Sequence, residues 1–220
     1  MATAPLYGRR PTATVTALER FVHTAEVTQF KVRSQRTVVT RCHGLASELR
    51  SALLQLPSHQ SDPAVVDAIW RGESLGTLLW ALSLVELPAY DTPFDYDVLV
   101  AERIDNPHLR SKEEIEHARD AAQLWHWRAR TTLLQAEGSV ALPERWQSFD
   151  QLIAATAMHG FESGLLPAPL RGDFRAFEAV YRNLTPSQHA VTHSIALERH
   201  HALNWLCGLG STWDDVPTDT

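Results

Sequence analysis

Apolar residues recur along much of this chain at steps of three and four residues, the spacing of amphipathic helices. The clearest run predicts a helix over residues 34–56 and consists of Val38, Cys42, Leu45, Leu49 and Leu53. Alternation of β-branched with polar residues, which is typical of a half-buried strand, does not stand out anywhere. The pattern therefore predicts an all-α protein with no significant sheet.

Capping residues place the boundaries of the longer helices. Asp62 before Pro63 predicts a helix over 63–87, because proline suits the first turn, and Pro88 ends it. Ser111 with Glu114 forms a capping box for a helix that ends at Gly138. The same signals begin helices at Ser148 with Gln151 and at Thr185 with Gln188. The last of these helices carries Val191, Ile195, Ala202, Leu203 and Leu206 on one face.

Three shorter helices complete the prediction. They span residues 15–23, 96–104 and 174–184, and Asp173 is expected to cap the third. Residues 1–14 are rich in proline, threonine and alanine and are expected to be loose. The sequence thus predicts a single helical domain over residues 15–220, built as a bundle of about seven or eight helices.

Two glycines interrupt the most apolar of these helices. Gly72 and Gly76 each cost about 1 kcal/mol of helix stability relative to alanine. Their spacing of four residues predicts that another helix crosses closely over this face.

Composition narrows the class of protein. The chain has 220 residues, and its formal charge of −6 comes without a cluster of Lys and Arg, which argues against a nucleic-acid surface. No apolar run reaches the eighteen residues of a membrane span, and residues 1–15 contain no apolar stretch typical of a secretion signal. Two isolated cysteines form neither a disulfide framework nor a zinc knuckle. We therefore expect a soluble cytoplasmic protein.

Several separated stretches resemble a known family. They are WRGESLGTLLWAL (70–82), ARDAAQLWHWRART (118–131), DFRAF (173–177) and ERHHALNWL (198–206), followed by WDDVPTDT (213–220). In this order they resemble the bacterial family called domain of unknown function 4272 (DUF4272), over roughly residues 33–220. The resemblance implies an all-helical cytoplasmic domain and no particular activity.

Several charged residues lie on helix faces that the spacing of apolar residues predicts to be buried. They are Arg71, Glu73, Arg128, Glu198 and Arg199. Converging guanidinium groups can hold a carboxylate or phosphate ligand, whereas a buried ion network fixes the register of helices. We expect the network. Arg199 in particular is predicted to be buried and paired with a carboxylate, either Glu73 or one of Asp214 and Asp215.

Metal and cofactor sites are not expected. Glu114-x-x-His117 and Glu198-x-x-His201 match half of a carboxylate-bridged di-iron site, for which Glu73 and Glu162 are further candidates. Against this, Glu114 is already explained as a capping residue, and His201 points away from the apolar face of its helix. His189 and His193 are too few to hold zinc.

Aromatic and histidine side chains supply the remaining candidates for binding. The chain contains seven tryptophans, and Trp125, Trp205 and His126 lie on or beside apolar faces. We expect a non-catalytic binding or protein-interaction module with an unknown protein or small-molecule partner. The alternative is an enzyme or small-anion-binding protein whose pocket is formed by Arg, Trp and His side chains.

Overall fold

The computed structural model describes residues 30–55, 62–101, 103–138, 142 and 146–218. Within these residues the chain forms six α-helices, a two-stranded hairpin and one 3₁₀ turn. The α-helices are α2 (Gln35–Gln55), α3 (Pro63–Ala81), α4 (Tyr96–Ala101), α5 (Lys112–Glu137), α6 (Phe149–Glu162) and α7 (Pro186–Leu206). The mainly helical class is confirmed, with fewer helices than the seven or eight expected. The predicted loose residues 1–14 and helix 15–23 lie outside the described residues.

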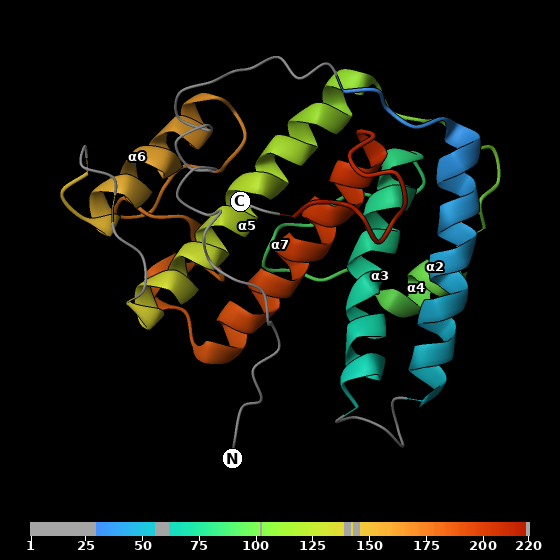
Figure 1. Ribbon diagram of the computed structural model, residues 1–220, viewed down its shortest axis with the longest axis horizontal. Helices are drawn as coiled ribbons and strands as arrows, with labels where there is room; N and C mark the ends of the chain where they lie inside the picture. The colour runs from blue at the N-terminus through green and yellow to red at the C-terminus, as the bar shows by residue number, and fades with distance from the viewer. Residues whose placement is uncertain (1–29, 56–61, 102, 139–141, 143–145, 219–220) are drawn as a thin grey trace.

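The five long helices are arranged side by side in an order that differs from their order in the sequence. α3 lies between α2 and α7, while α5 packs along the other side of α7 and α6 covers α5 (Figure 1). Buried side chains from all six helices join one hydrophobic cluster, which runs from Val38 to Val216. α7 is therefore the central element, in contact with α3 on one side and α5 on the other. None of the described helices is both long and apolar enough to cross a membrane.

The predicted helix starts are confirmed by hydrogen bonds at the caps. The Asp62 carboxylate accepts from the Ala64 N–H, and reciprocal capping boxes join Ser111 with Glu114 and Thr185 with Gln188. Gly138 ends α5 in the left-handed conformation, with φ of 62°. At α6 only half of the predicted box forms, because Gln151 accepts from the backbone N–H of Gln147 and not from that of Ser148.

α3 ends six residues earlier than predicted. Its last carbonyls are bound by a distant segment: the N–H of Arg110 donates to Ala81, and the N–H of His108 donates to Leu82. Ser83 follows with φ of 61°, which turns the chain away from the helix axis. The prediction that the helix continues to residue 87 was wrong because tertiary hydrogen bonds end it before Pro88 does.

The predicted helix over residues 174–184 was also wrong. The segment forms strands β1 (Arg175–Ala176) and β2 (Ala179–Val180), followed by the 3₁₀ turn η1 (Tyr181–Asn183). Phe177 and Glu178 connect the strands with positive φ values of 49° and 56°, as a tight hairpin turn requires. This hairpin is the small sheet that the sequence pattern did not reveal.

Aromatic rings, and not a crossing helix, cover the two glycines of α3. A Cβ at Gly76 would lie 2.4 Å from the ring of Phe94, and one at Gly72 would lie 2.8 Å from the ring of Tyr96. Phe94 belongs to the segment between α3 and α4, and Tyr96 is the first residue of the short helix α4. The close approach was predicted, but its cause was not.

Gly76→Ala is expected to destabilise the protein by about 1–3 kcal/mol, the usual cost of overpacking. The Phe94 ring is buried, and the Phe94 N–H is bound to Glu73, so the ring cannot easily move. Gly44 is a matched control, because its nearest neighbour would be 3.9 Å from an added Cβ. Gly44→Ala should raise stability by about 0.5–1 kcal/mol through helix propensity. Urea unfolding that gives both variants the same sign of change would contradict the packing described here.

Candidate functional site

Arg199 of α7 is buried and paired with Glu73 of α3, as the sequence predicted. Its Nε and Nη2 lie 2.9 and 2.8 Å from Glu73 Oε2, and both side chains are fully buried. The other two predicted partners, Asp214 and Asp215, are exposed on the segment after α7 and were wrong.

All hydrogen-bonding positions of this pair are occupied within the protein. Arg199 Nη1 donates to the carbonyls of Pro88 and Ala89, and Nη2 also donates to Thr92. Glu73 Oε1 accepts from the Phe94 N–H and the Tyr96 hydroxyl. A guanidinium group has five N–H donors. Arg199 makes four hydrogen bonds with them, and its Nη2 is also in ion-pair contact with Glu73. The pair therefore holds the 88–96 segment against α3 and α7 and has no donor left for a ligand.

Arg128 of α5 forms a second closed network with Asp173. Its Nε and Nη2 lie 2.7 and 2.9 Å from the two carboxylate oxygens, and the guanidinium group stacks on the Tyr181 ring at 4.5 Å. Asp173 also accepts from the N–H groups of Phe174 and Arg182. Asp173 was predicted only as a helix cap, so its pairing with Arg128 was missed.

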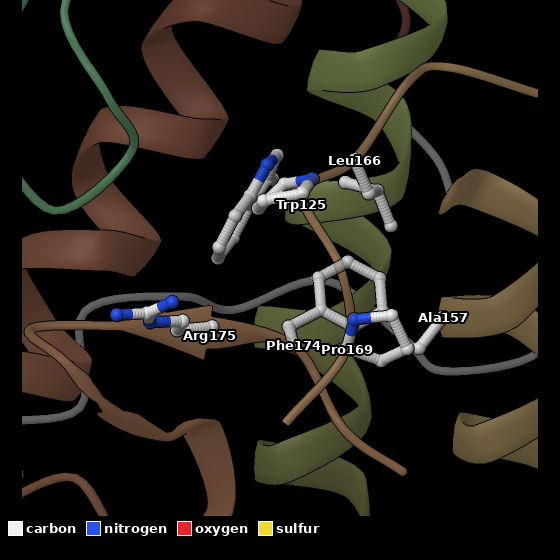
Figure 2. A pocket seen from close by; sticks show the side chains of 7 residues that line it. Trp125, Ala157, Leu166, Pro169, Phe174 and Arg175 are labelled. Atoms are coloured by element: carbon white, nitrogen blue, oxygen red, sulfur yellow. The ribbon is translucent and has the colours of Figure 1, made fainter. Parts of the chain in front are cut away.

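The aromatic candidates Trp125 and Trp205 are core residues on different helices. Trp125 stacks on Tyr90 with ring centroids 5.2 Å apart, and it lines a shallow depression between α5, α6 and the hairpin. The rest of its lining is Ala157, Leu166, Pro167, Pro169, Phe174 and Arg175. Figure 2 shows the Arg175 guanidinium extending away from the other labelled side chains. The depression is apolar and offers no convergent polar groups for a ligand.

His126 is buried in the interface between α5 and α7, where it meets His200. The two Nδ1 atoms are 3.1 Å apart. Burial lowers the pKa of both rings, for His200 to about 3, and neighbouring cations lower it further. Both histidines are therefore neutral at physiological pH. Among the described residues, no three potential metal ligands converge.

The remaining two candidates, Arg71 and Glu198, lie where α2, α3 and α7 meet at the surface. They belong to a group that we call the α2–α3–α7 cluster: Arg41, Glu48, Arg71, Ser74, Glu198, His201 and Trp213. Arg71 Nη1 lies 3.2 Å from Glu48, and the Arg71 side chain is 47% exposed. Of the eight residues that the sequence proposed, the structure brings only these two together in a solvent-facing group.

Glu198 is the titratable centre of the cluster. Its carboxylate accepts a 2.7 Å hydrogen bond from the buried Ser74 hydroxyl, and no cation lies within ion-pair distance in the described residues. Burial raises the pKa of Glu198 to about 7, although the Ser74 hydrogen bond and the charge of Arg71 lower it. A carboxyl group that changes charge near neutral pH is typical of functional sites.

Trp213 closes one side of the cluster. The segment after α7, residues 208–218, which we call the C-terminal tail, folds back so that the Trp213 ring lies 4.2 Å from the Arg41 guanidinium carbon. The Trp213 ring also packs edge-on against His201 and Trp205. Arg41 Nε is buried and has no hydrogen-bond partner. Sequence reasoning missed Arg41, because it lies on the polar side of α2 and gives no local signal.

Glu198→Gln is expected to remove a pH dependence of stability. The folded pKa of about 7 exceeds the ordinary value of 4.5, so the folded state holds the proton more tightly. This contribution is complete below pH 4.5 and is lost as pH rises through 7. Glutamine cannot lose a proton, so at pH 8 the variant should be more stable than the parent by up to about 3 kcal/mol. Thermal melts at pH 5 and pH 8 measure the difference, and equal shifts at both would contradict it.

Comparison of the chain with protein-family models, with curated proteins and with solved structures gave no match. The resemblance to the DUF4272 family therefore stays a prediction from the sequence.

Proposed function

We propose that the protein is a non-catalytic binding module that contacts a protein partner through the α2–α3–α7 cluster. The observation that carries this proposal is the saturation of the Arg199–Glu73 pair. A pocket of converging arginines needs unpaired donors, and Arg199 has none. A small-anion pocket formed by Arg71, Arg128 and Arg199 is therefore disfavoured. Arg199 has no free donor, and Arg128 is paired with Asp173.

The cluster has the composition of a contact surface between proteins. Arginine and tryptophan are the residues that most often dominate binding energy at such surfaces, and Arg41, Arg71 and Trp213 lie together here. Glu48 holds both guanidinium groups in place, at 3.8 Å from Arg41 and 3.2 Å from Arg71. Such fixed side chains lose little freedom on binding.

Charge reversal at Arg71 tests this proposal. Arg71→Glu should reduce by at least tenfold the recovery of a specific partner that the parent protein captures from its own cells. Arg103→Glu is the matched control, because this arginine is 85% exposed and lies after α4, away from the cluster. Each variant loses an exposed ion pair, Arg71 with Glu48 and Arg103 with Asp105, so each should stay folded with a loss of stability of about 1 kcal/mol or less. If every captured protein binds the Arg71→Glu variant as well as the parent, the proposed surface is wrong.

A second candidate function is supported by two features of the same cluster. The Glu198 carboxyl exchanges its proton near pH 7, and the Arg41 Nε donor is unpaired. These groups suit an enzyme or a small-anion-binding protein, with Glu198 as general acid or base. Inorganic phosphate and acetate serve as probes. A melting point that rises with either anion in the parent, but not in Arg41→Met, would favour this candidate over the interaction module.

The cellular setting is proposed on the sequence alone. The order of the motifs over residues 33–220 supports membership of the bacterial DUF4272 family, and with it a cytoplasmic location.

A further inference from the structure

Asn204 of α7 connects the buried histidine pair to the C-terminal tail. Its Oδ1 accepts from Arg119 Nε at 3.0 Å, and its Nδ2 donates to the Pro217 carbonyl at 2.8 Å. The first partner can only donate and the second can only accept. The orientation of the amide is therefore fixed by chemistry. The same Nδ2 lies 3.0 Å from His200 Nε2, which must accept its second hydrogen.

This orientation determines the proton positions on both histidines. His200 Nε2 accepts, so the proton of the neutral ring is on Nδ1. That N–H donates to His126 Nδ1 at 3.1 Å, so His126 in turn carries its proton on Nε2. We call this series of hydrogen bonds, from Pro217 through Asn204 and His200 to His126, the relay. The direction of each hydrogen bond fixes the direction of the next.

The two ring nitrogens that carry no proton each accept a hydrogen bond, so an added proton would face an N–H group. A proton on His126 Nδ1 would face the N–H of His200, and a proton on His200 Nε2 would face the N–H of Asn204. Rotation of the Asn204 amide would relieve the second clash. Its oxygen would then face the Pro217 carbonyl, and its NH₂ would face Arg119 Nε. The attraction that holds Pro217 against α7 would become a repulsion.

The charged groups around the histidine pair also make protonation unfavourable while the tail is closed. Arg119 and Arg130 of α5 and His193 and His201 of α7 act on the two rings, and each disfavours added positive charge. Among the described residues, neither ring forms an ion pair with a carboxylate. Arg119 pairs with Asp120 at 2.9 Å, and Asp214 of the tail acts on His201.

We propose that protonation of the His126–His200 pair releases the end of the C-terminal tail, residues 216–218, from α7, so that this end opens at acidic pH. Residues 208–213 stay in place, because Arg33 Nη2 donates to the Gly210 carbonyl and His201 Nε2 donates to the Trp213 carbonyl. Opening exposes Val216, which is otherwise 8% exposed. The inference rests on the hydrogen-bond geometry and is independent of the function proposed above.

Thiol accessibility at position 216 tests the proposal. Val216→Cys places a thiol on the buried side of the tail. The thiol reacts with 4,4′-dithiodipyridine, forming a mixed disulfide and releasing thiopyridone, only when this end of the tail is open. Leu54→Cys is the reference for the reagent's own pH dependence, since Leu54 is 78% exposed. The ratio of the two rates should rise about tenfold from pH 7.5 to 5.5 if one histidine regains its ordinary pKa of 6.5 on opening, and about a hundredfold if both do.

Three variants in the Val216→Cys background complete the experiment. His126→Asn with His200→Gln keeps an acceptor and a donor at the required positions without a titratable ring, so the rate ratio should stay flat. Asn204→Ala removes the hydrogen bond to the Pro217 carbonyl, so the thiol should react faster than in the parent at pH 7.5. His117→Gln, at an exposed histidine, should behave as the parent.

Three outcomes would overturn the proposal. The first is a ratio that does not change with pH in the parent, which decides the matter even where the double variant does not fold. The second is a double variant that opens as the parent does. The third is labelling of Cys42 at pH 5.5, because this core thiol is fully buried and reacts only on global unfolding.

Discussion

Arg199→Met is expected to destabilise the protein by about 3–5 kcal/mol, the cost of leaving one member of a buried ion pair uncompensated. Glu73 would remain fully buried with its charge, and the carbonyls of Pro88, Ala89 and Thr92 would lose their donors. Methionine fills a similar space, so the loss reports on charge and hydrogen bonds more than on packing. Urea unfolding at pH 7 measures it.

The double variant Arg199→Met with Glu73→Gln separates the two contributions. Glutamine keeps an oxygen that accepts from the Phe94 N–H and the Tyr96 hydroxyl, but it carries no charge. The double variant should therefore be more stable than Arg199→Met alone. Arg71→Met is the surface control and should change stability by less than about 0.5 kcal/mol. An Arg199→Met protein as stable as the parent would indicate that the site is a cluster of repelling charges awaiting an anion.

Asp173→Asn is expected to cost a similar amount, about 3–5 kcal/mol. It removes the only carboxylate within ion-pair distance of Arg128 in the described part of the chain, and Arg128 is 1% exposed. Arg182 Nε, 3.4 Å from the same carboxylate, would add to the uncompensated positive charge. The hairpin and η1 should loosen first, because Asp173 binds the N–H groups of Phe174 and Arg182.

Glu178→Gln is the matched control for Asp173. It also removes a carboxylate that pairs with an arginine, Arg175, but the Glu178 side chain is 83% exposed. Exposed ion pairs contribute little, so the change should stay below about 1 kcal/mol. Hydrogen exchange of the 173–184 amides and the unfolding free energy should both distinguish the two variants. Equal effects would contradict a structural role for the Arg128–Asp173 pair.

Sequence reasoning found the Arg199–Glu73 pair because both residues lie in long helices with regular spacing. Projection placed Arg199 among apolar neighbours, and a buried cation requires an anion. The prediction of a helix over residues 174–184, where the hairpin lies, was wrong for the opposite reason. Asp173 gives the same local signal whether it caps a helix or binds a distant arginine, and only the position of Arg128 decides between them.

The candidate site was predictable only in part. Arg71 and Glu198 were identified from charge on helix faces, but the residues that complete their cluster come from segments far apart in the sequence. Arg41 and Trp213 are 172 positions apart and meet only because the tail folds back. The role of His200 in the relay depends on Asn204 and Pro217. The spacing of apolar residues along the sequence does not reveal contacts between such distant segments.

The position of Arg199 near the end of the chain has a consequence during synthesis on the ribosome. Glu73 and the carbonyls of the 88–92 loop are made more than a hundred residues before their guanidinium partner emerges. Until then, α3 carries a carboxylate on the face that must be buried, and water has to solvate it. The nascent chain consequently cannot complete its core from the first half alone. Folding of this protein is expected to wait until α7 has left the ribosome, with chaperones covering the apolar faces of α2 and α3 in the meantime.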